Sequence, residues 1–181
     1  SLCDLLTIEI ESGAPSCSLT CSDASLTTDQ SNLILKVYNL LIDRLGSYSI
    51  NVHLNKRIPM GAGLGGGSSN AAAFFNVLNT QLQLGISDDK AISLLTTLGS
   101  DIPFFLYGGT AFVSGIGETI KVMEPITEQF YVLVFTHQHL STVDVYRYFD
   151  SNPDYAAALP LECFKFLLSY VVTRRRTRRG G

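Results

Sequence analysis

The sequence is most distinctive at Pro59-Met-Gly-Ala-Gly-Leu-Gly-Gly-Gly-Ser-Ser-Asn70, where positions 61, 63, 65, 66 and 67 are all glycine. Glycine adopts positive φ readily and has no Cβ, so several backbone N–H groups of such a segment can converge on one anion. An apolar helical pattern begins near Ser68, and the unpaired N–H groups and positive dipole end of a helix N-terminus also attract phosphate. We therefore predict a phosphate-binding loop that opens into a helix.

Other interpretations of this glycine-rich segment fit less well. A Walker P-loop requires Gly-Lys-Ser or Gly-Lys-Thr at the helix start, and the sequence has Gly67-Ser-Ser69 without a lysine. A dinucleotide fingerprint matches Gly61-x-Gly63-x-x-Gly66, but the preceding strand pattern is amphipathic and no acidic residue ends a second strand about 20 residues on. A glycine-rich surface turn without a function would cost conformational entropy on folding, and glycines have no side chains whose packing could offset that cost.

Hydrophobic periodicity on either side of the loop predicts an α+β fold. Alternation of apolar and polar residues predicts strands at 6–10, 17–21 and 50–54, with the first two paired as a hairpin, and further strands at 104–107, 110–114 and 131–135. Apolar residues at helical spacing predict helices at 33–45, with Asp29 or Ser31 as N-cap, at 68–84, at 88–98 after Ser87, at 143–149 and at 161–170. Because strands and helices do not alternate regularly, we expect a mixed, mostly antiparallel sheet with helices packed on it.

Composition and charge narrow the possible functions. Of 181 residues, 46% are hydrophobic and 16% are charged, as in one globular domain with a sizeable apolar core. The net charge is −3, and five arginines lie in residues 174–179, so the remainder carries about −8. Such an acidic body does not favour nucleic-acid binding, and no apolar run reaches the roughly 18 residues that span a membrane. We expect free thiols at Cys3, Cys17, Cys21 and Cys163, because their spacing suits neither a zinc site nor a disulfide scaffold.

A series of segments resembles, in order, segments of the GHMP kinases, a family of small-molecule kinases. They are Asn32-Leu33-Ile34, Lys56-Arg57-Ile58-Pro59, the loop from Pro59 to Ala73, Leu98-Gly-Ser-Asp-Ile-Pro-Phe-Phe105, Gly115-Ile-Gly-Glu118 and Leu140-Ser-Thr-Val-Asp-Val-Tyr146. The triple-glycine loop and the Gly-Ser-Asp-Ile-Pro-Phe-Phe run are the most specific of them. The resemblance covers roughly residues 4–150 and implies the GHMP kinase N-terminal domain, a ribosomal protein S5 domain 2-like fold.

The resemblance implies an ATP-dependent kinase. Within the family, the chain is similar to members that phosphorylate the C2 hydroxyl of a cytidine diphosphate-linked methylerythritol in the non-mevalonate (MEP) pathway of isoprenoid, or terpenoid, biosynthesis. Asp101 matches the family's catalytic aspartate, which would accept the hydroxyl proton as phosphoryl transfer begins. We expect the apolar residues after Asp101 to limit its hydration. Mg²⁺ is expected to arrive with ATP, and His137 and His139 predict no metal site because no third ligand is evident.

The same resemblance implies roles for further residues. Asn32 and Lys56 would lie at the adenosine pocket, and Thr142 and Tyr146 would lie near the cytidine of a small-molecule substrate, with Tyr146 stacking on the base. ATP binding is assigned to the loop and the first turn of its helix: Pro59, Met60, Gly61, Ala62, Gly63, Leu64, Gly65, Gly66, Gly67, Ser68, Ser69 and Asn70.

Several of these residues also have a plain structural interpretation. Asn32 could cap its helix, Lys56 could be an ordinary solvated charge, and Tyr146 could belong to the core. Asp101 could act as the cap of the segment that follows it. These interpretations stay open at the level of the sequence.

The chain departs from the family pattern at both ends. It starts after the Pro-Ala-Lys-Leu-Asn-like segment that supplies a second catalytic residue, a lysine, and it leaves the pattern near Ser151. We expect 1–150 to form the ATP-binding N-terminal domain without its first strand, 151–173 to begin an incomplete C-terminal region, and 174–181 to be a disordered basic tail. Because the lysine would neutralise charge on the moving phosphoryl group, we expect weak or no turnover from this chain.

Two other functions remain open. Another GHMP kinase, of the homoserine or phosphomevalonate type, would share the loop but not Gly99-Ser-Asp-Ile-Pro-Phe-Phe105, and a remnant could bind nucleotide without catalysis. For the kinase we expect the cytoplasm of a bacterium, or a plastid (chloroplast or apicoplast) of a eukaryote. The sequence does not predict an oligomeric state.

Overall fold

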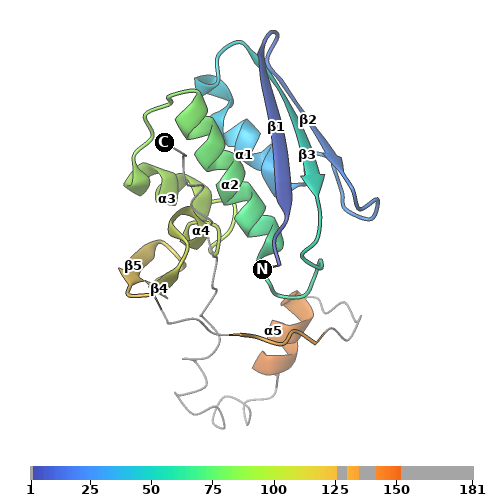
Figure 1. The fold of residues 1–181 in the computed structure, drawn as a ribbon. Coiled ribbons are helices and arrows are strands. Elements are labelled where there is room, and N and C mark those ends of the chain that lie inside the picture. Colours follow the sequence, from blue (N-terminus) through green and yellow to red (C-terminus); the bar gives the residue numbers. More distant parts are fainter. Residues whose placement is uncertain (1, 126–129, 135–141, 152–181) are drawn as a thin grey trace.

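A three-stranded sheet with helices on one face makes up most of the described chain (Figure 1). The structure is a computed structural model and describes residues 2–125, 130–134 and 142–151. Helix α1 packs against β2 and α2, and α4 packs against α2. In chain order the elements are β1 (Leu5–Ser12), β2 (Ser16–Cys21), α1 (Leu33–Leu41), the 3₁₀ helix η1 (Ile42–Arg44), β3 (Tyr48–Asn55), α2 (Gly66–Gln81), α3 (Asp88–Thr96), α4 (Phe104–Tyr107), β4 (Thr110–Ser114), β5 (Thr119–Met123) and α5 (Thr142–Asp150).

The sheet is mixed, as predicted, but its strand order is β1-β3-β2, so the predicted hairpin of the first two strands is wrong. β1 pairs with β3 antiparallel, and β2 pairs with β3 in parallel. β3 takes the central position because it is the most deeply buried strand, through Ile50, Val52 and Leu54. The parallel pair needs a long crossover connection, which α1 supplies. Alternation in the sequence indicates which residues face inward, but not which strands are neighbours.

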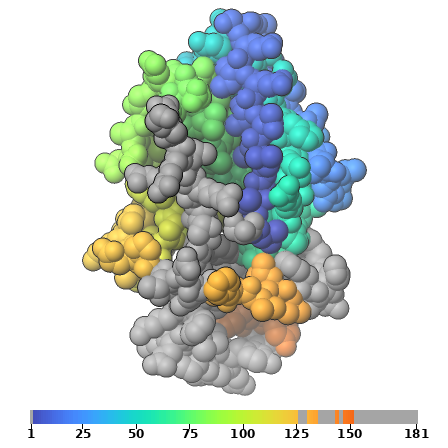
Figure 2. All heavy atoms as spheres, in the orientation of Figure 1, coloured from blue at the N-terminus to red at the C-terminus, as the bar shows by residue number. Residues whose placement is uncertain are grey.

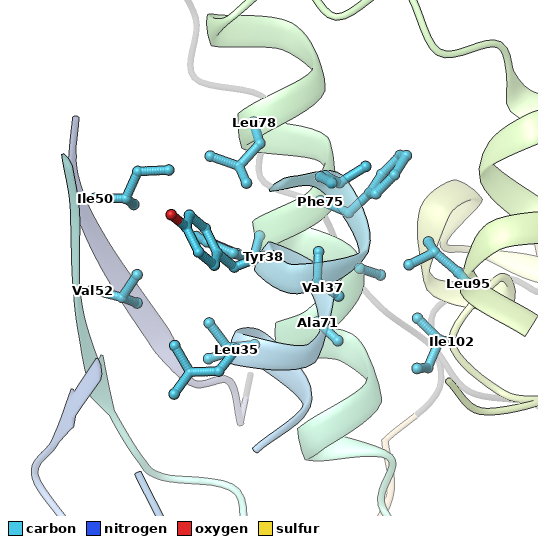
Figure 3. Packing of buried hydrophobic residues seen from close by; sticks show 14 of the residues in the cluster. Leu35, Val37, Tyr38, Ile50, Val52, Ala71, Phe75, Leu78, Leu95 and Ile102 are labelled. Atoms are coloured by element: carbon cyan, nitrogen blue, oxygen red, sulfur yellow. The ribbon is translucent and has the colours of Figure 1, made fainter. Parts of the chain in front are cut away.

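The hydrophobic core lies between the sheet and the helices. Figure 3 shows Tyr38 and Leu35 of α1 on the side of the sheet that carries Ile50 and Val52 of β3. Leu95 of α3 and Ile102 belong to the same cluster and lie on the side of α1 and α2 that faces away from the sheet (Figure 3). Ile102 is completely buried, so the core holds the backbone next to Asp101 in place.

The N-cap of helix α1 lies one residue after Ser31 and three after Asp29, the two predicted caps. The N-cap is Asn32, whose Oδ1 accepts a hydrogen bond from the backbone N–H of Ile34 at 3.0 Å. Asp29, one of the two predicted caps, instead accepts from the N–H of Ser31, the other, at 2.8 Å in the preceding turn. The structural interpretation of Asn32 as a cap is therefore confirmed.

Residues Phe104–Tyr107 form the short helix α4 instead of the predicted strand. Aromatic residues favour strands, but Pro103 has φ at −59° in the helical range, and the N–H of Phe105 donates to the carbonyl of Ile102 at 3.0 Å. Strand β4 agrees with the predicted strand at 110–114. Its partner β5 has no counterpart among the predictions, because only Ile120 along it is even partly buried.

The remaining predictions divide between described and undescribed residues. Helix α5 agrees with the helix predicted at 143–149, whereas 131–134 of the predicted strand 131–135 form neither helix nor strand. Cys3, Cys17 and Cys21 are free thiols, and burial raises the pKa of Cys17 to about 11. None of the described helices is long and apolar enough to cross a bilayer. Outside the described residues lie the predicted helix 161–170, the basic tail, Cys163, His137 and His139.

Candidate functional site

The glycine loop connects β3 to α2 through three left-handed residues. Gly61, Gly63 and Gly65 have φ of +66°, +68° and +64°, where residues with a side chain are strained. Gly65 is the N-cap of α2, so the helix begins at Gly66 and not at the predicted Ser68. Its carbonyl accepts the first helical hydrogen bond, from the N–H of Ser69 at 2.8 Å. The positive φ values confirm that the loop depends on glycine, although helix α2 incorporates the last two glycines.

Those last two glycines permit close approach of side chains. A Cβ built on Gly66 would lie 2.9 Å from Nζ of Lys56 and 3.0 Å from Cγ2 of Ile58. A Cβ on Gly67 would lie 3.6 Å from Cδ1 of Leu33, at the start of α1. Helical geometry leaves the N–H groups of the first turn without intrahelical partners. The loop therefore presents backbone donors at a positive helix end with a lysine ammonium beside it.

The loop lines a cavity of about 310 Å³. Its walls include Lys56, Leu26 and every residue from 59 to 68, which are predicted ATP ligands except for Leu26. Ser69 lies on the first turn of α2 and donates from Oγ to the carbonyl of Gly66 at 2.9 Å. Asn70 does not line this cavity and is buried. The structure thus brings most of the predicted ATP-binding residues to one hollow.

Asp101 lies in a turn between α3 and α4 and lines a second cavity of about 440 Å³. The carboxylate side chain is exposed, so the expectation that apolar neighbours limit its hydration is wrong. Phe104 and Phe105, which begin helix α4, line the same cavity. The opposite wall is formed by the β4–β5 turn, residues 115–117.

One side chain, Phe105, lines the Asp101 cavity and also contacts the glycine loop. The ring of Phe105 lines the Asp101 cavity, and a Cβ built on Gly65 would lie 2.6 Å from Cζ of that ring. Only a glycine fits at position 65, because both its φ and the ring exclude a side chain. Phe105 therefore links the glycine loop to the cavity that Asp101 lines.

The β4–β5 turn is packed directly on the Asp101 turn. Gly117 has φ of +105°, and a Cβ built there would overlap the carbonyl oxygen of Ser100. Within the same turn, the N–H of Ile116 donates to Oε2 of Glu118 at 2.6 Å. The sequence contains this turn in the Gly115-Ile-Gly-Glu118 segment, but nothing in the spacing of those residues predicts that it supports Asp101.

Asp4 is a buried residue that sequence reasoning missed. Strand β1 runs along the molecular surface (Figure 2), yet the side chain of Asp4, just before it, is only 1% exposed. Its Oδ2 lies 2.5 Å from Nζ of Lys56, whose side chain is 6% exposed, and accepts from Nδ2 of Asn70 at 2.8 Å. Its Oδ1 accepts from the N–H groups of Arg57 and Ile58 at 2.7 and 2.8 Å. Lys56 is therefore not an ordinary solvated charge, and no periodic signal in the sequence marks Asp4.

The pKa of Asp4 reflects two opposed effects. Burial alone would raise the pKa, but hydrogen bonds from Ile58, Lys56, Arg57 and Asn70 outweigh it, and the pKa lies below its ordinary value of 3.8. The folded state therefore favours the carboxylate over the acid. Stability from this group is fully present above the unfolded-state pKa, near 4, and is lost as the pH falls through the lower folded-state pKa.

Acid sensitivity of folding is the expected consequence. The wild-type urea midpoint should fall between about pH 5 and about pH 3, and part of that fall should disappear in Asp4→Asn, which cannot titrate. Asp23 and Asp29, whose pKa values are lowered by hydrogen bonds from Ser25 and Ser31, contribute acid dependence in the same direction, so some of it should remain in the variant. Midpoints measured by circular dichroism across this range test it. An Asp4→Asn variant with the full wild-type acid dependence would contradict the assignment.

The other predicted site residues are placed as follows. Both polar atoms of the Asn32 side chain are used locally, since Nδ2 donates to the carbonyl of Thr27 at 2.8 Å in addition to the cap. Its neighbour Leu33 nevertheless lies against the loop, so Asn32 is close to the cavity. Thr142 and Tyr146 lie in α5, and their side chains are outside the described part of the chain. The adenosine and cytidine roles therefore stay predictions.

Comparison with known proteins gives consistent results. Residues 32–109 match the family model for the GHMP kinases N terminal domain. The chain is 41% identical over 140 residues to a 4-diphosphocytidyl-2-C-methyl-D-erythritol kinase of Chlorobium phaeobacteroides, covering 76% of this chain and 49% of that protein. It is 44% identical over 110 residues to the protein of the same name from Neisseria gonorrhoeae, covering 61% and 39%.

Solved structures give the same result for the fold. A crystal structure of 4-(cytidine 5'-diphospho)-2C-methyl-D-erythritol kinase superposes with a TM-score of 0.61 at 32% identity, over 81% of this chain and 51% of that one. A homoserine kinase from Cytophaga hutchinsonii, at 16% identity, shares the fold with a TM-score of 0.53, over 91% of this chain and 61% of that one. The chain spans about half the length of the curated relatives it matches. By its fold, its loop and these matches, the chain carries a GHMP kinase N-terminal domain and belongs to the GHMP kinases.

Proposed function

We propose that this chain is the nucleotide-binding part of a kinase that transfers the γ-phosphate of ATP to the C2 hydroxyl of 4-diphosphocytidyl-2-C-methyl-D-erythritol. The products are ADP and the 2-phosphate, in the non-mevalonate route to isoprenoids. The names of the most similar relatives support the substrate. The proposal places the reaction in the cytoplasm of a bacterium or in a plastid of a eukaryote.

One geometric observation carries the proposal. The glycine loop and Asp101 line two cavities, and the ring of Phe105, which lines the Asp101 cavity, lies against Gly65 of the loop. A nucleotide whose phosphates rest on the loop would direct its terminal phosphate towards the Asp101 cavity. The cavity of about 440 Å³ around Asp101 has room for the hydroxyl-bearing part of a small substrate. Phosphoryl transfer requires this arrangement, because donor and acceptor oxygens must lie in line.

The residues of this chain divide the work between binding and proton transfer. The N–H groups at the start of α2 and the ammonium of Lys56 hold the phosphates and balance their charge. Asp101 accepts the proton of the C2 hydroxyl as its oxygen attacks the γ-phosphorus and the bond to the β-phosphate oxygen breaks. The exposure of Asp101 suits a base that must be reached by an incoming hydroxyl.

Mg²⁺ fits this site through oxygen ligands. Among the described residues, no group of three or more His, Cys, Asp or Glu side chains is arranged to hold a metal ion. Hard oxygen donors bordering the two cavities include the hydroxyls of Ser68 and Ser100 and the carboxylate of Asp101. These residues would face an ion that enters bound to the phosphates of ATP, where it supplies positive charge.

The test is a single-turnover assay with the 181-residue chain in excess over ATP labelled in its γ-phosphate. Excess protein makes even slow transfer visible, which matters if turnover is weak. We expect label to appear on the cytidine substrate and not on homoserine or phosphomevalonate. Titration calorimetry with ATP, run in parallel, should show binding. Binding without transfer to any of the three acceptors would favour a non-catalytic nucleotide-binding protein, and transfer to another acceptor would identify another kinase of the family.

A further inference from the structure

The carboxylate of Asp4 ties together three segments that are distant in the sequence. It precedes β1, it accepts from Lys56, Arg57 and Ile58 after β3, and it accepts from Asn70 in the first turn of α2. In Figure 1 the start of the chain accordingly lies beside the beginning of α2. All four hydrogen bonds to Asp4 thus come from residues just before or just after the glycine loop.

The contact with Lys56 reaches the loop itself. Nζ of Lys56 lies where a side chain on Gly66 would have to go, and Lys56 lines the loop cavity. An ammonium group has three N–H bonds, and the contact with Asp4 uses one of them. The others remain to meet an anion in the cavity, so Asp4 fixes the direction of a cation that faces the loop.

Fold stability alone does not account for this pair. Taking both charges out of water is costly, and apolar residues of similar size commonly stabilise a fold as well as a buried ion pair does. Here the pair is buried, at 1% and 6% exposure, beside a hollow lined by backbone donors. A buried ion pair at this position has a function in binding if it fixes the ammonium group of Lys56 for contact with an anionic ligand.

We propose that Asp4 is a positioning residue for the phosphate groups of the nucleotide: it orients Lys56 towards the loop cavity and fixes both ends of the loop. This inference rests on the proposed function, because it assumes that the loop holds phosphate. The inference predicts a change in anion affinity opposite to the one expected from charge alone. Removing a negative charge near an anion site should strengthen anion binding through simple electrostatics, whereas loss of the positioning residue weakens it.

The experiment measures affinity for inorganic tripolyphosphate and for ATP by titration calorimetry on the 181-residue chain. We expect Asp4→Asn to bind both ligands about tenfold more weakly than wild type, as expected when a buried charge pair at a binding site loses one partner. Glu11→Gln removes the same charge from an exposed position at the far end of β1 and is the matched control, with affinity equal to or above wild type. A Lys56→Met variant and the double variant Asp4→Asn/Lys56→Met show whether Asp4 acts through Lys56. If it does, the double variant binds no more weakly than Lys56→Met.

Thermal unfolding monitored by circular dichroism identifies which variants are folded. If Asp4→Asn fails to fold, the double variant takes its place, because it leaves neither charge buried without a partner. A folded Asp4→Asn variant with affinity equal to or above wild type, or a double variant that binds more weakly than Lys56→Met, would overturn the inference while leaving the proposed function intact. Unfolding of both variants also counts against it, since Asp4 then serves the fold. Failure of wild type to bind either ligand would remove the proposed function and this inference together.

Discussion

Replacing Asp101 with asparagine is expected to slow phosphoryl transfer by about 10²–10⁴-fold, the contribution typical of a positioned general base. Asparagine keeps the size of the side chain but cannot take up the hydroxyl proton. Asp101 lines the cavity next to the loop, and no hydrogen bond or ion pair from the described residues occupies its carboxylate. ATP affinity should not fall, because the proposed function places the phosphates on residues 61–69 and Lys56 and not on Asp101. The single-turnover assay measures the rate, and calorimetry measures the affinity.

A surface carboxylate serves as the control for this substitution. Asp43 is exposed in η1, and Asp43→Asn changes the net charge equally without touching either cavity. Its transfer rate should match that of wild type. Asp101→Asn with an undiminished rate would exclude Asp101 as the base, and equal losses in rate and ATP affinity would indicate that Asp101 contributes to nucleotide binding instead.

Replacing Gly117 with alanine is expected to damage both stability and transfer. The new Cβ would overlap the carbonyl oxygen of Ser100, and the φ of +105° lies outside the region that residues with a side chain tolerate. Backbone strain of this kind costs about 1–3 kcal/mol, and the overlap adds to it unless the Ser100–Asp101 turn moves away. Movement of that turn shifts the proposed base, and misplacement by about 1 Å can cost roughly 10²-fold in rate. Urea unfolding and the single-turnover assay measure the two effects.

The variant Gly85→Ala is the control that distinguishes backbone strain from movement of the Ser100–Asp101 turn. Gly85 also has positive φ, at +65°, but a Cβ there meets no atom within 4 Å. The Gly85→Ala variant should therefore be less stable than wild type, with an unchanged transfer rate. If Gly117→Ala behaved like Gly85→Ala, with wild-type transfer by the folded protein, the β4–β5 turn would not position Asp101.

Sequence patterns predicted most of the elements because those patterns are local. The buried alternation of β3 and the helical spacing of Leu35, Tyr38 and Leu41 follow from the faces that these elements bury. Local patterns were wrong where a single neighbour decided the geometry: Pro103 makes a helix of an aromatic segment that reads as a strand. Strand β5 was missed because an exposed hairpin strand has little apolar periodicity to detect.

The glycine loop is the part of the site that the sequence determines by itself. Glycine at 61, 63 and 65 is required by the backbone conformation of the loop, a property of each residue alone, so the composition of the segment predicts its shape. The likeness of the surrounding segments to GHMP kinases indicates the same site, including Asp101.

Only the tertiary structure decides how these parts meet. The order β1-β3-β2 places Asp4 beside residues 56–58 and Asn70, which no spacing in the sequence brings together. The contact of the Phe105 ring with Gly65 and the packing of Gly117 on Ser100 likewise join segments separated along the chain. The physical reason is the same in each case. Local conformation depends on a few neighbouring residues, whereas a buried charge or a close backbone contact depends on which distant segments the core packs side by side.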